Sequence, residues 1–153
     1  MTDLQLTHTI IGSAIAVRRE PGPGLLEAIY EECLSHGLTI GNIAFEGQKP
    51  IPAVYKGAKL DCGYRADIVV LSRVIVEIKA ISAVAPIHDA VILAYLRLSG
   101  CMIGLLINLH SAVLKDGIKR YVGKYVSVDE KKRTKHRDTE DTEIRCLKKR
   151  FEC

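Results

Sequence analysis

The stretch from residue 64 to residue 80 constrains the fold most, because it places charged side chains inside two runs that otherwise favour β-structure. Val and Ile dominate both runs, which indicates two strands joined by a short turn. Side chains on a strand alternate between faces, so Glu77 and Lys79 share one face and Ile78 lies on the other. Burying an acid and a base here is costly, and Asp67 on the first run could lie beside them. Two carboxylates and a lysine at a strand end are typical of a divalent-metal site that attacks a phosphodiester.

The apolar periodicity on either side of this stretch predicts an α/β domain. We expect helices over 6–17, capped by Thr2 or Thr7, and from 25 to about 37–41, followed by strands over 43–49, 51–55, 60–70 and 74–80. A helix over 87–98, a nearly all-apolar strand over 102–109 and an edge strand over 118–126 complete the pattern. Short connections predict antiparallel neighbours among the strands of 43–80. The helical crossover predicts that strand 102–109 runs parallel to strand 74–80.

The last part of the chain differs in kind from the rest. Residues 130–143 contain no apolar side chain and cannot bury a core face. We therefore expect one domain over 1–126 and a charged, disordered tail over 127–153. A solvated helix end is the other interpretation of this segment, and its basic half could contact the backbone of a nucleic acid.

Composition narrows the class of protein. No apolar run reaches the roughly 18 residues of a membrane span, and the N-terminus carries no signal pattern, so we expect a cytoplasmic protein without a membrane partner. Five cysteines without Cys-x-x-Cys spacing argue against a zinc ribbon or a disulfide framework. The net charge of +4 is too small to identify a nucleic-acid binder or to exclude one. The absence of Trp argues against a base-stacking platform.

Several short motifs occur together and in order. They are Gly24-x-x-Glu27-x-x-Tyr30, Gly63 to Asp67, Val76 to Ala80, Ile87-His88, and Gly104 to Asn108. In this order and spacing the chain resembles the GxxExxY protein family of the PD-(D/E)XK nuclease superfamily, over about residues 5–125.

The resemblance implies a restriction-endonuclease-like core, in which a central mixed β-sheet is flanked by helices in the order α-α-β-β-β-α-β. It also implies a metal-dependent nuclease that acts on DNA or RNA with Mg²⁺ or Mn²⁺. Asp67 and Glu77 would bind the metal, Glu27 would complete its shell, and Lys79 would position or activate the attacking water. The backbone carbonyl of Ile78 could supply a further oxygen ligand.

The chain departs from the family pattern at three positions. Val91 stands where the helix usually has Gln, Arg18 stands where the first helix usually has His, and His8 stands where a Glu is usual. These departures favour a second hypothesis, a catalytically weak or inactive nuclease-fold module that binds nucleic acid or a protein. A third hypothesis is an oligomeric scaffold, for example a homodimer, in which the charged residues form only an ion-pair network.

Each candidate side chain has an ordinary structural interpretation as well. Glu27 could be a charge at a helix N-terminus. Tyr30 could orient Glu27 or a phosphate, or pack in the core. Arg65 could bind a phosphate, or pair with Asp61 or Glu77. His88 could bind the substrate, or cap its helix.

Overall fold

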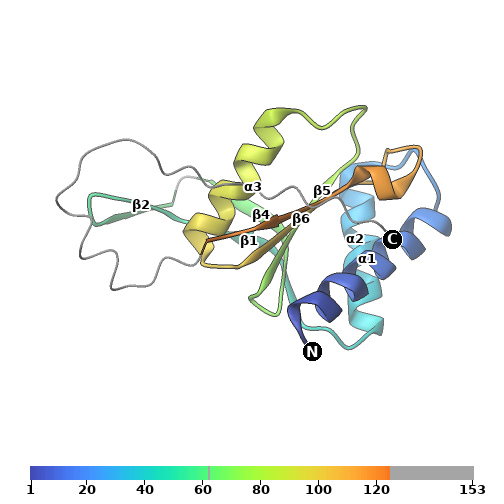
Figure 1. The fold of residues 1–153 in the computed structure, drawn as a ribbon, viewed down its shortest axis with the longest axis horizontal. Helices are drawn as coiled ribbons and strands as arrows, with labels where there is room; N and C mark the ends of the chain where they lie inside the picture. The colour runs from blue at the N-terminus through green and yellow to red at the C-terminus, as the bar shows by residue number, and fades with distance from the viewer. Residues whose placement is uncertain (62, 125–153) are drawn as a thin grey trace.

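The computed structural model describes residues 1–61 and 63–124 (Figure 1). The expected charged tail over 127–153 therefore lies outside the described residues. Within these described residues there are three α-helices, α1 (Asp3–Arg19), α2 (Glu27–Ile40) and α3 (Pro86–Ser99), and a short 3-10 helix η1 (Leu114–Gly117). The strands are β1 (Phe45–Pro50), β2 (Ala53–Tyr55), β3 (Ala58–Leu60), β4 (Arg65–Val70), β5 (Val74–Lys79), β6 (Ile103–Asn108) and β7 (Ile118–Val122).

Five strands form one mixed sheet in the order β1-β4-β5-β6-β7. Strands β5 and β6 are parallel and are joined through α3, while β1–β4, β4–β5 and β6–β7 are antiparallel. The predicted parallel crossover and the mixed sheet are therefore confirmed. Gly104 on β6 lets α3 approach closely, because a Cβ atom there would lie 3.0 Å from the side chain of Ile92.

The predicted meander of successive neighbours is wrong in its middle part. Strand β1 pairs with β4, and the segment between them forms a separate two-stranded sheet of β2 and β3. The predicted continuous strand over 60–70 is interrupted between Leu60 and Arg65. Gly63 has a positive φ of 81°, a conformation that does not continue a strand, so the chain changes direction there.

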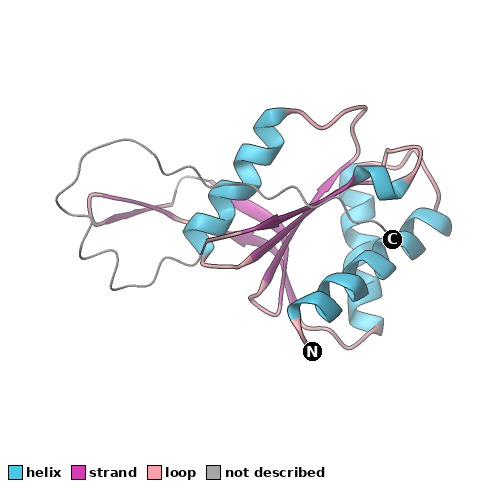
Figure 2. Cartoon of the chain, viewed as in Figure 1, coloured by secondary structure: helices cyan, strands magenta, loops and turns pink. Residues whose placement is uncertain are grey.

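Helices cover both faces of the sheet and give three layers (Figure 2). The apolar faces of α1 and α2 pack on one side, where they meet Val74, Val76 and Ile78 of β5. The buried side of α3 packs on the other face, against Ile75 and Leu106. No helix in the described part of the chain is long and apolar enough to cross a bilayer.

Local signals set the helix ends. Thr2 caps α1 with its hydroxyl, which accepts from the Gln5 amide at 3.2 Å, while the Gln5 side chain accepts from the Thr2 amide at 2.8 Å. Gly100 ends α3 in the left-handed conformation. These ends fix where the chain enters and leaves the sheet.

Candidate active site

Strands β4 and β5 separate at the position of the predicted acids. Their pairing ends with Ile68 opposite Val76, one residue before Asp67 would face Glu77. Beyond this point the backbones of the two strands no longer pair. Instead, Oδ2 of Asp67 accepts a hydrogen bond from the Ile78 amide at 2.8 Å. The opening between the strands is therefore lined by side-chain oxygens instead of being closed by backbone pairing.

The carbonyl group of Ile78 is directed toward the same opening. The Lys79 carbonyl accepts from the Leu109 amide at 2.8 Å, so Lys79 turns its backbone toward β6. The amide and the carbonyl of one strand residue point to the same edge, and successive residues alternate between edges. The backbone polar groups of Ile78 therefore face β4, where its amide meets Asp67.

Lys79 lies between two carboxylates. Its Nζ is 3.2 Å from Oε1 of Glu77, on the same strand, and 3.5 Å from Oε1 of Glu27, the first residue of α2. The side chain of Glu77 is only 8% exposed, and its Oε2 is buried without a hydrogen-bond partner among the described residues. Burial raises the pKa of Glu77, and the nearby backbone amide of Asp67 offsets only a small part of this rise, since it forms no hydrogen bond of normal length and angle with Glu77. One buried carboxylate oxygen thus lacks a hydrogen-bond donor.

The two acids bind protons more tightly than usual. Burial raises the pKa of Asp67 to about 6, although the Ile78 amide and Lys79 lower it. Burial, and after it the charge of Asp67, raises the pKa of Glu77 to about 7. For Lys79, burial lowers the pKa, but Glu77 and Glu27 more than offset this and raise it overall. The site therefore has an excess of buried negative charge that one lysine only partly neutralises.

The comparison with known families agrees with this arrangement. The PD-(D/E)XK nuclease superfamily model matches residues 4–121, which is more than half of the chain. The chain belongs to the PD-(D/E)XK nuclease superfamily. No curated protein and no solved structure gives a significant match. The expected restriction-endonuclease-like fold is confirmed, with β2 and β3 inserted and β7 added at the edge.

PD-(D/E)XK nucleases generally use divalent metal ions, and the residues present fit such an ion. The buried Oε2 of Glu77 lacks a partner, the two neighbouring carboxyl groups have raised pKa values, and hard oxygen atoms suit Mg²⁺ or Mn²⁺. Among residues 1–61 and 63–124, no three His, Cys, Asp or Glu side chains form a metal cage on their own. Asp67, Glu77 and the carbonyl of Ile78 are thus the groups that would hold such an ion.

Glu27 and Arg65 lie at the margin of the candidate site. The carboxylate of Glu27 forms an ion pair with Lys79, and the Glu27 side chain is 42% exposed. Arg65 is exposed and donates from Nη1 to the Gln48 carbonyl at 3.4 Å; it forms no ion pair with Asp61 or Glu77. A phosphate contact by Arg65 stays a prediction.

Tyr30 and His88 both have structural contacts of their own, and their predicted roles in substrate binding stay predictions. Tyr30 is fully buried, and its hydroxyl donates to the Gly22 carbonyl at 2.9 Å and accepts from the Leu25 amide at 3.3 Å. The Nδ1 atom of His88 accepts from the Ala85 amide at 2.9 Å, so His88 caps α3. Of the two interpretations considered for each residue, the structure supports core packing for Tyr30 and capping for His88.

Two residues near the site were not recognised from the sequence as candidate site residues. Tyr95 on α3 donates from its hydroxyl to the Arg65 carbonyl at 3.0 Å, and its pKa is raised by burial and then by the charge of Glu77. A hydroxyl on the apolar face of the predicted helix was the available signal. Tyr95 thus links α3 to the strand that carries Asp67.

Asn108 is the second residue that sequence reasoning missed. It is 2% exposed, its Nδ2 donates to the Ile81 carbonyl at 2.9 Å, and its Oδ1 accepts from the Ile81 amide at 3.1 Å. A polar side chain at the end of an all-apolar strand was the available signal. Asn108 fixes the backbone two residues after Lys79.

Proposed function

We propose that this chain is a metal-dependent nuclease that hydrolyses phosphodiester bonds of DNA or RNA with water as the nucleophile. Membership of the PD-(D/E)XK superfamily supports a nuclease-type function. The observation that carries the proposal is the opening between β4 and β5, where Asp67 and Glu77 lie beside Lys79 and one carboxylate oxygen has no hydrogen-bond donor. The order and spacing of the Gly24-x-x-Glu27-x-x-Tyr30 and later motifs further support membership of the GxxExxY family.

Asp67, Glu77 and the carbonyl of Ile78 would hold the metal ion, for which we propose Mg²⁺, with Mn²⁺ as a substitute. When bound, such an ion makes a coordinated water more acidic and stabilises charge on the phosphoryl oxygens. Glu27 would contribute from the N-terminus of α2, either through a water ligand of the ion or by holding Lys79.

Lys79 acts in this proposal as a cation and a hydrogen-bond donor. In the metal-free protein burial lowers the pKa of Lys79, but Glu77 and Glu27 more than offset this, so the ammonium group is protonated at neutral pH. Held between Glu77 and Glu27, it would orient the attacking water or stabilise negative charge that develops on the phosphate. Asn108 would support this role by fixing the segment that follows Lys79.

One observation favours a catalytically weak or inactive nucleic-acid-binding module as the second candidate. Val91 occupies the helix position where GxxExxY proteins usually have Gln, and it packs against the apolar core beneath α3. The chain therefore supplies no amide side chain at that position to support Lys79 or a phosphate.

The test is cleavage of plasmid DNA and of a single-stranded RNA by the full chain, with Mg²⁺ and with EDTA. We expect Mg²⁺-dependent products with one of the substrates, and a loss of at least about 100-fold in rate in Lys79→Ala, the size usual for removing one transition-state donor. Lys115→Ala, which removes an exposed lysine of η1, is the control and should cleave as the wild type does. Products that persist in EDTA or in Lys79→Ala would refute the proposal, and metal-independent binding without products would favour the second candidate.

A further inference from the structure

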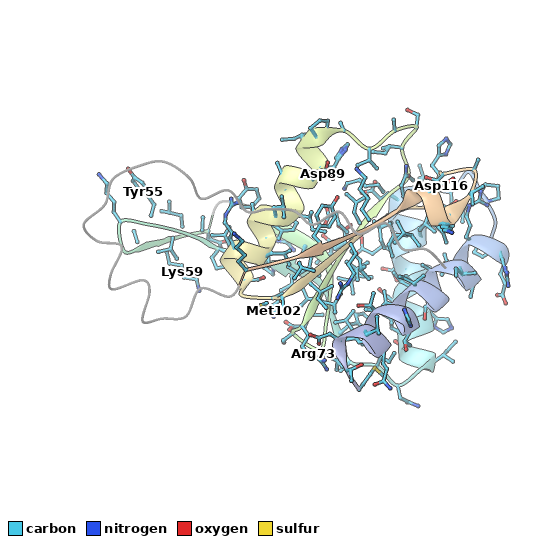
Figure 3. All side chains as sticks on the ribbon, viewed as in Figure 1. Tyr55, Lys59, Arg73, Asp89, Met102 and Asp116 are labelled. Carbon is cyan, nitrogen blue, oxygen red and sulfur yellow. The ribbon has the colours of Figure 1, made fainter. Side chains whose placement is uncertain are left out.

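The small sheet of β2 and β3 projects beyond the rest of the domain as a separate hairpin (Figure 1). We call residues 53–60 the arm. Figure 3 places Tyr55 and Lys59 on this hairpin, away from the three helices. At its base the Ile51 amide donates to the Tyr64 carbonyl at 2.8 Å, and Pro50 pairs with Arg65. The arm is thus an extension of two strands of the main sheet.

The arm has a defined conformation without a core of its own. Lys56 and Gly57 both have positive φ, 49° and 79°, as required in a two-residue turn that matches the twist of a hairpin. Yet Val54 and Tyr55 are 65% and 64% exposed, and all three residues of β3 are exposed. A two-stranded hairpin without an apolar face to pack on is marginally stable in water. Its exposed apolar and aromatic side chains indicate a surface that a partner covers.

Charge on the arm indicates the kind of partner. From residue 49 to residue 65 the chain has four basic side chains and one acidic side chain, Asp61, a net charge of 4 − 1 = +3. Residues 1–124 have 13 basic and 11 acidic side chains, so the rest of this part has a net charge of 2 − 3 = −1. Lys49 at the base is paired with Glu46 at 2.7 Å, so the positive charge of this segment that no described carboxylate pairs lies on Lys56, Lys59 and Arg65. This favours a polyanion and disfavours a second copy of the arm, which would bring like charges together.

The base of the arm contacts elements that carry the candidate active site. Arg65 begins β4 and lies two residues before Asp67. Tyr64 packs edge-on against Tyr95, with ring centroids 5.7 Å apart, and the Tyr95 hydroxyl donates to the Arg65 carbonyl. A ligand held by the arm would therefore be positioned relative to the two acids.

We propose that the arm is a contact surface for double-stranded DNA, in which Lys56 and Lys59 bind phosphates and hold the duplex at the β4–β5 opening. The inference rests on the proposed function for its choice of a nucleic acid. The major groove of B-form DNA admits a two-stranded ribbon, whereas the major groove of an RNA duplex is too deep and narrow for side chains to read. The shape of the arm therefore fits the major groove of a DNA duplex better than that of an RNA duplex.

The experiment compares the full-length wild type with Lys56→Ala/Lys59→Ala and with the control Arg19→Ala/Lys115→Ala, which removes the same charge from exposed positions elsewhere. Binding of a labelled DNA duplex is followed by fluorescence anisotropy in EDTA at several salt concentrations. We expect the arm variant to bind about tenfold more weakly at low salt and its salt slope to fall by about two, one for each phosphate contact. The control should bind as the wild type does, and all three chains should melt at the same temperature.

Four outcomes separate the arm from the nuclease proposal. Equal DNA binding by the arm variant and the control would overturn the proposal that the arm binds DNA, even if the wild type cleaves DNA. An equal or larger loss for an RNA duplex would overturn the choice of DNA. A dimer that Val54→Ser/Leu60→Ser converts to monomers without changing DNA binding would assign the arm to a second copy and overturn the proposal. Arm-dependent DNA binding by a wild type that cleaves nothing with Mg²⁺ or Mn²⁺ would support the arm while the nuclease proposal fails.

Discussion

Glu77 occupies an environment that folding alone does not favour. Its Oε1 accepts from Lys79, but its Oε2 is buried without a hydrogen-bond donor among the described residues. A buried carboxylate that is only partly compensated lowers the stability of a fold. The pKa of Glu77 also shows that its charged form is disfavoured, because burial and the charge of Asp67 raise this pKa to about 7. A cation at this position would supply the interaction that the protein itself lacks.

Replacing Glu77 with Gln should therefore increase the stability of the metal-free protein while weakening metal binding. In EDTA at pH 8, Glu77→Gln removes a buried charge and keeps the shape of the side chain, so we expect the free energy of unfolding to rise by about 1–2 kcal/mol. Urea denaturation at that pH measures the change. Calorimetric titration with Mn²⁺ should show at least about tenfold weaker uptake by the variant.

Glu32→Gln is the matched control, since Glu32 is an exposed acid of α2. This variant should change the stability by less than about 0.5 kcal/mol and should bind Mn²⁺ as the wild type does. If Glu77→Gln were less stable than the wild type in EDTA and bound Mn²⁺ equally well, Glu77 would be a structural ion-pair partner of Lys79 and not a metal ligand.

For single residues, the sequence predicts which side chains share a face of a strand. It does not predict contacts between residues that are far apart in the chain. That Glu77 and Lys79 share a face follows from their spacing of two, and their 3.2 Å contact confirms it. The contacts of Asn108 with Ile81 and of Tyr95 with Arg65 join segments 27 and 30 residues apart. The residues around Asn108 and Tyr95 in the sequence do not indicate which distant residue each one contacts, so these contacts are known only from the fold.

Among the elements, the start of α2 has the most direct connection to the site, because Glu27 is its first residue. The N-terminus of α2 has no side-chain cap, and the residue before it is Leu26. Instead, the hydroxyl of Tyr30 reaches back to Gly22 and Leu25 in the preceding loop. Gly22 and Gly24 of that loop have positive φ values of 82° and 87°, so the turn needs glycine at both positions. The hydroxyl of Tyr30 thus fixes the turn that positions Glu27.

Tyr30→Phe should loosen this turn while leaving the core packed. The carbonyl of Gly22, a half-buried residue, would lose its donor, so we expect a loss of about 1 kcal/mol in the free energy of unfolding, measured by urea denaturation. Tyr55→Phe makes the same chemical change on the exposed arm and should leave the stability unchanged. Equal stability of the two variants would mean that the contacts of Tyr30 with the loop do not help to hold it.

The elements also mark the limit of prediction from local pattern. Helices α1 and α3 were predicted to within a few residues, because their apolar spacing and their end signals, Thr2 and Gly100, are local. The pairing of β1 with β4 was not predicted, since an inserted hairpin separates them and the rule that neighbours in sequence pair led to a meander. A hairpin between the predicted strands 51–55 and 60–70 follows from their short connection and is present as β2 and β3, but its separation from the main sheet depends on the break at Gly63.

For the molecule as a whole, the buried acids couple stability to pH. In the folded protein the pKa values of Asp67 and Glu77 are about 6 and about 7, compared with ordinary values of 3.8 and 4.5. Between the ordinary and the raised values the folded chain holds protons that the unfolded chain has released. The stabilisation from these two groups is therefore complete below about pH 4 and is lost as the pH rises through 6 and 7.

The metal-free protein should consequently be more stable at pH 5.5 than at pH 8, by about 2 kcal/mol, in urea denaturation with EDTA. The double variant Asp67→Asn/Glu77→Gln cannot titrate at these positions, so its stability should change little over the same interval. Saturating Mn²⁺ binds the deprotonated carboxylates and should stabilise the wild type more at pH 8 than at pH 5.5, which reverses or flattens the slope. A wild type that gains stability in EDTA from pH 5.5 to pH 8 would mean that its acids are already compensated within the fold. The β4–β5 opening would then have no need of a cation.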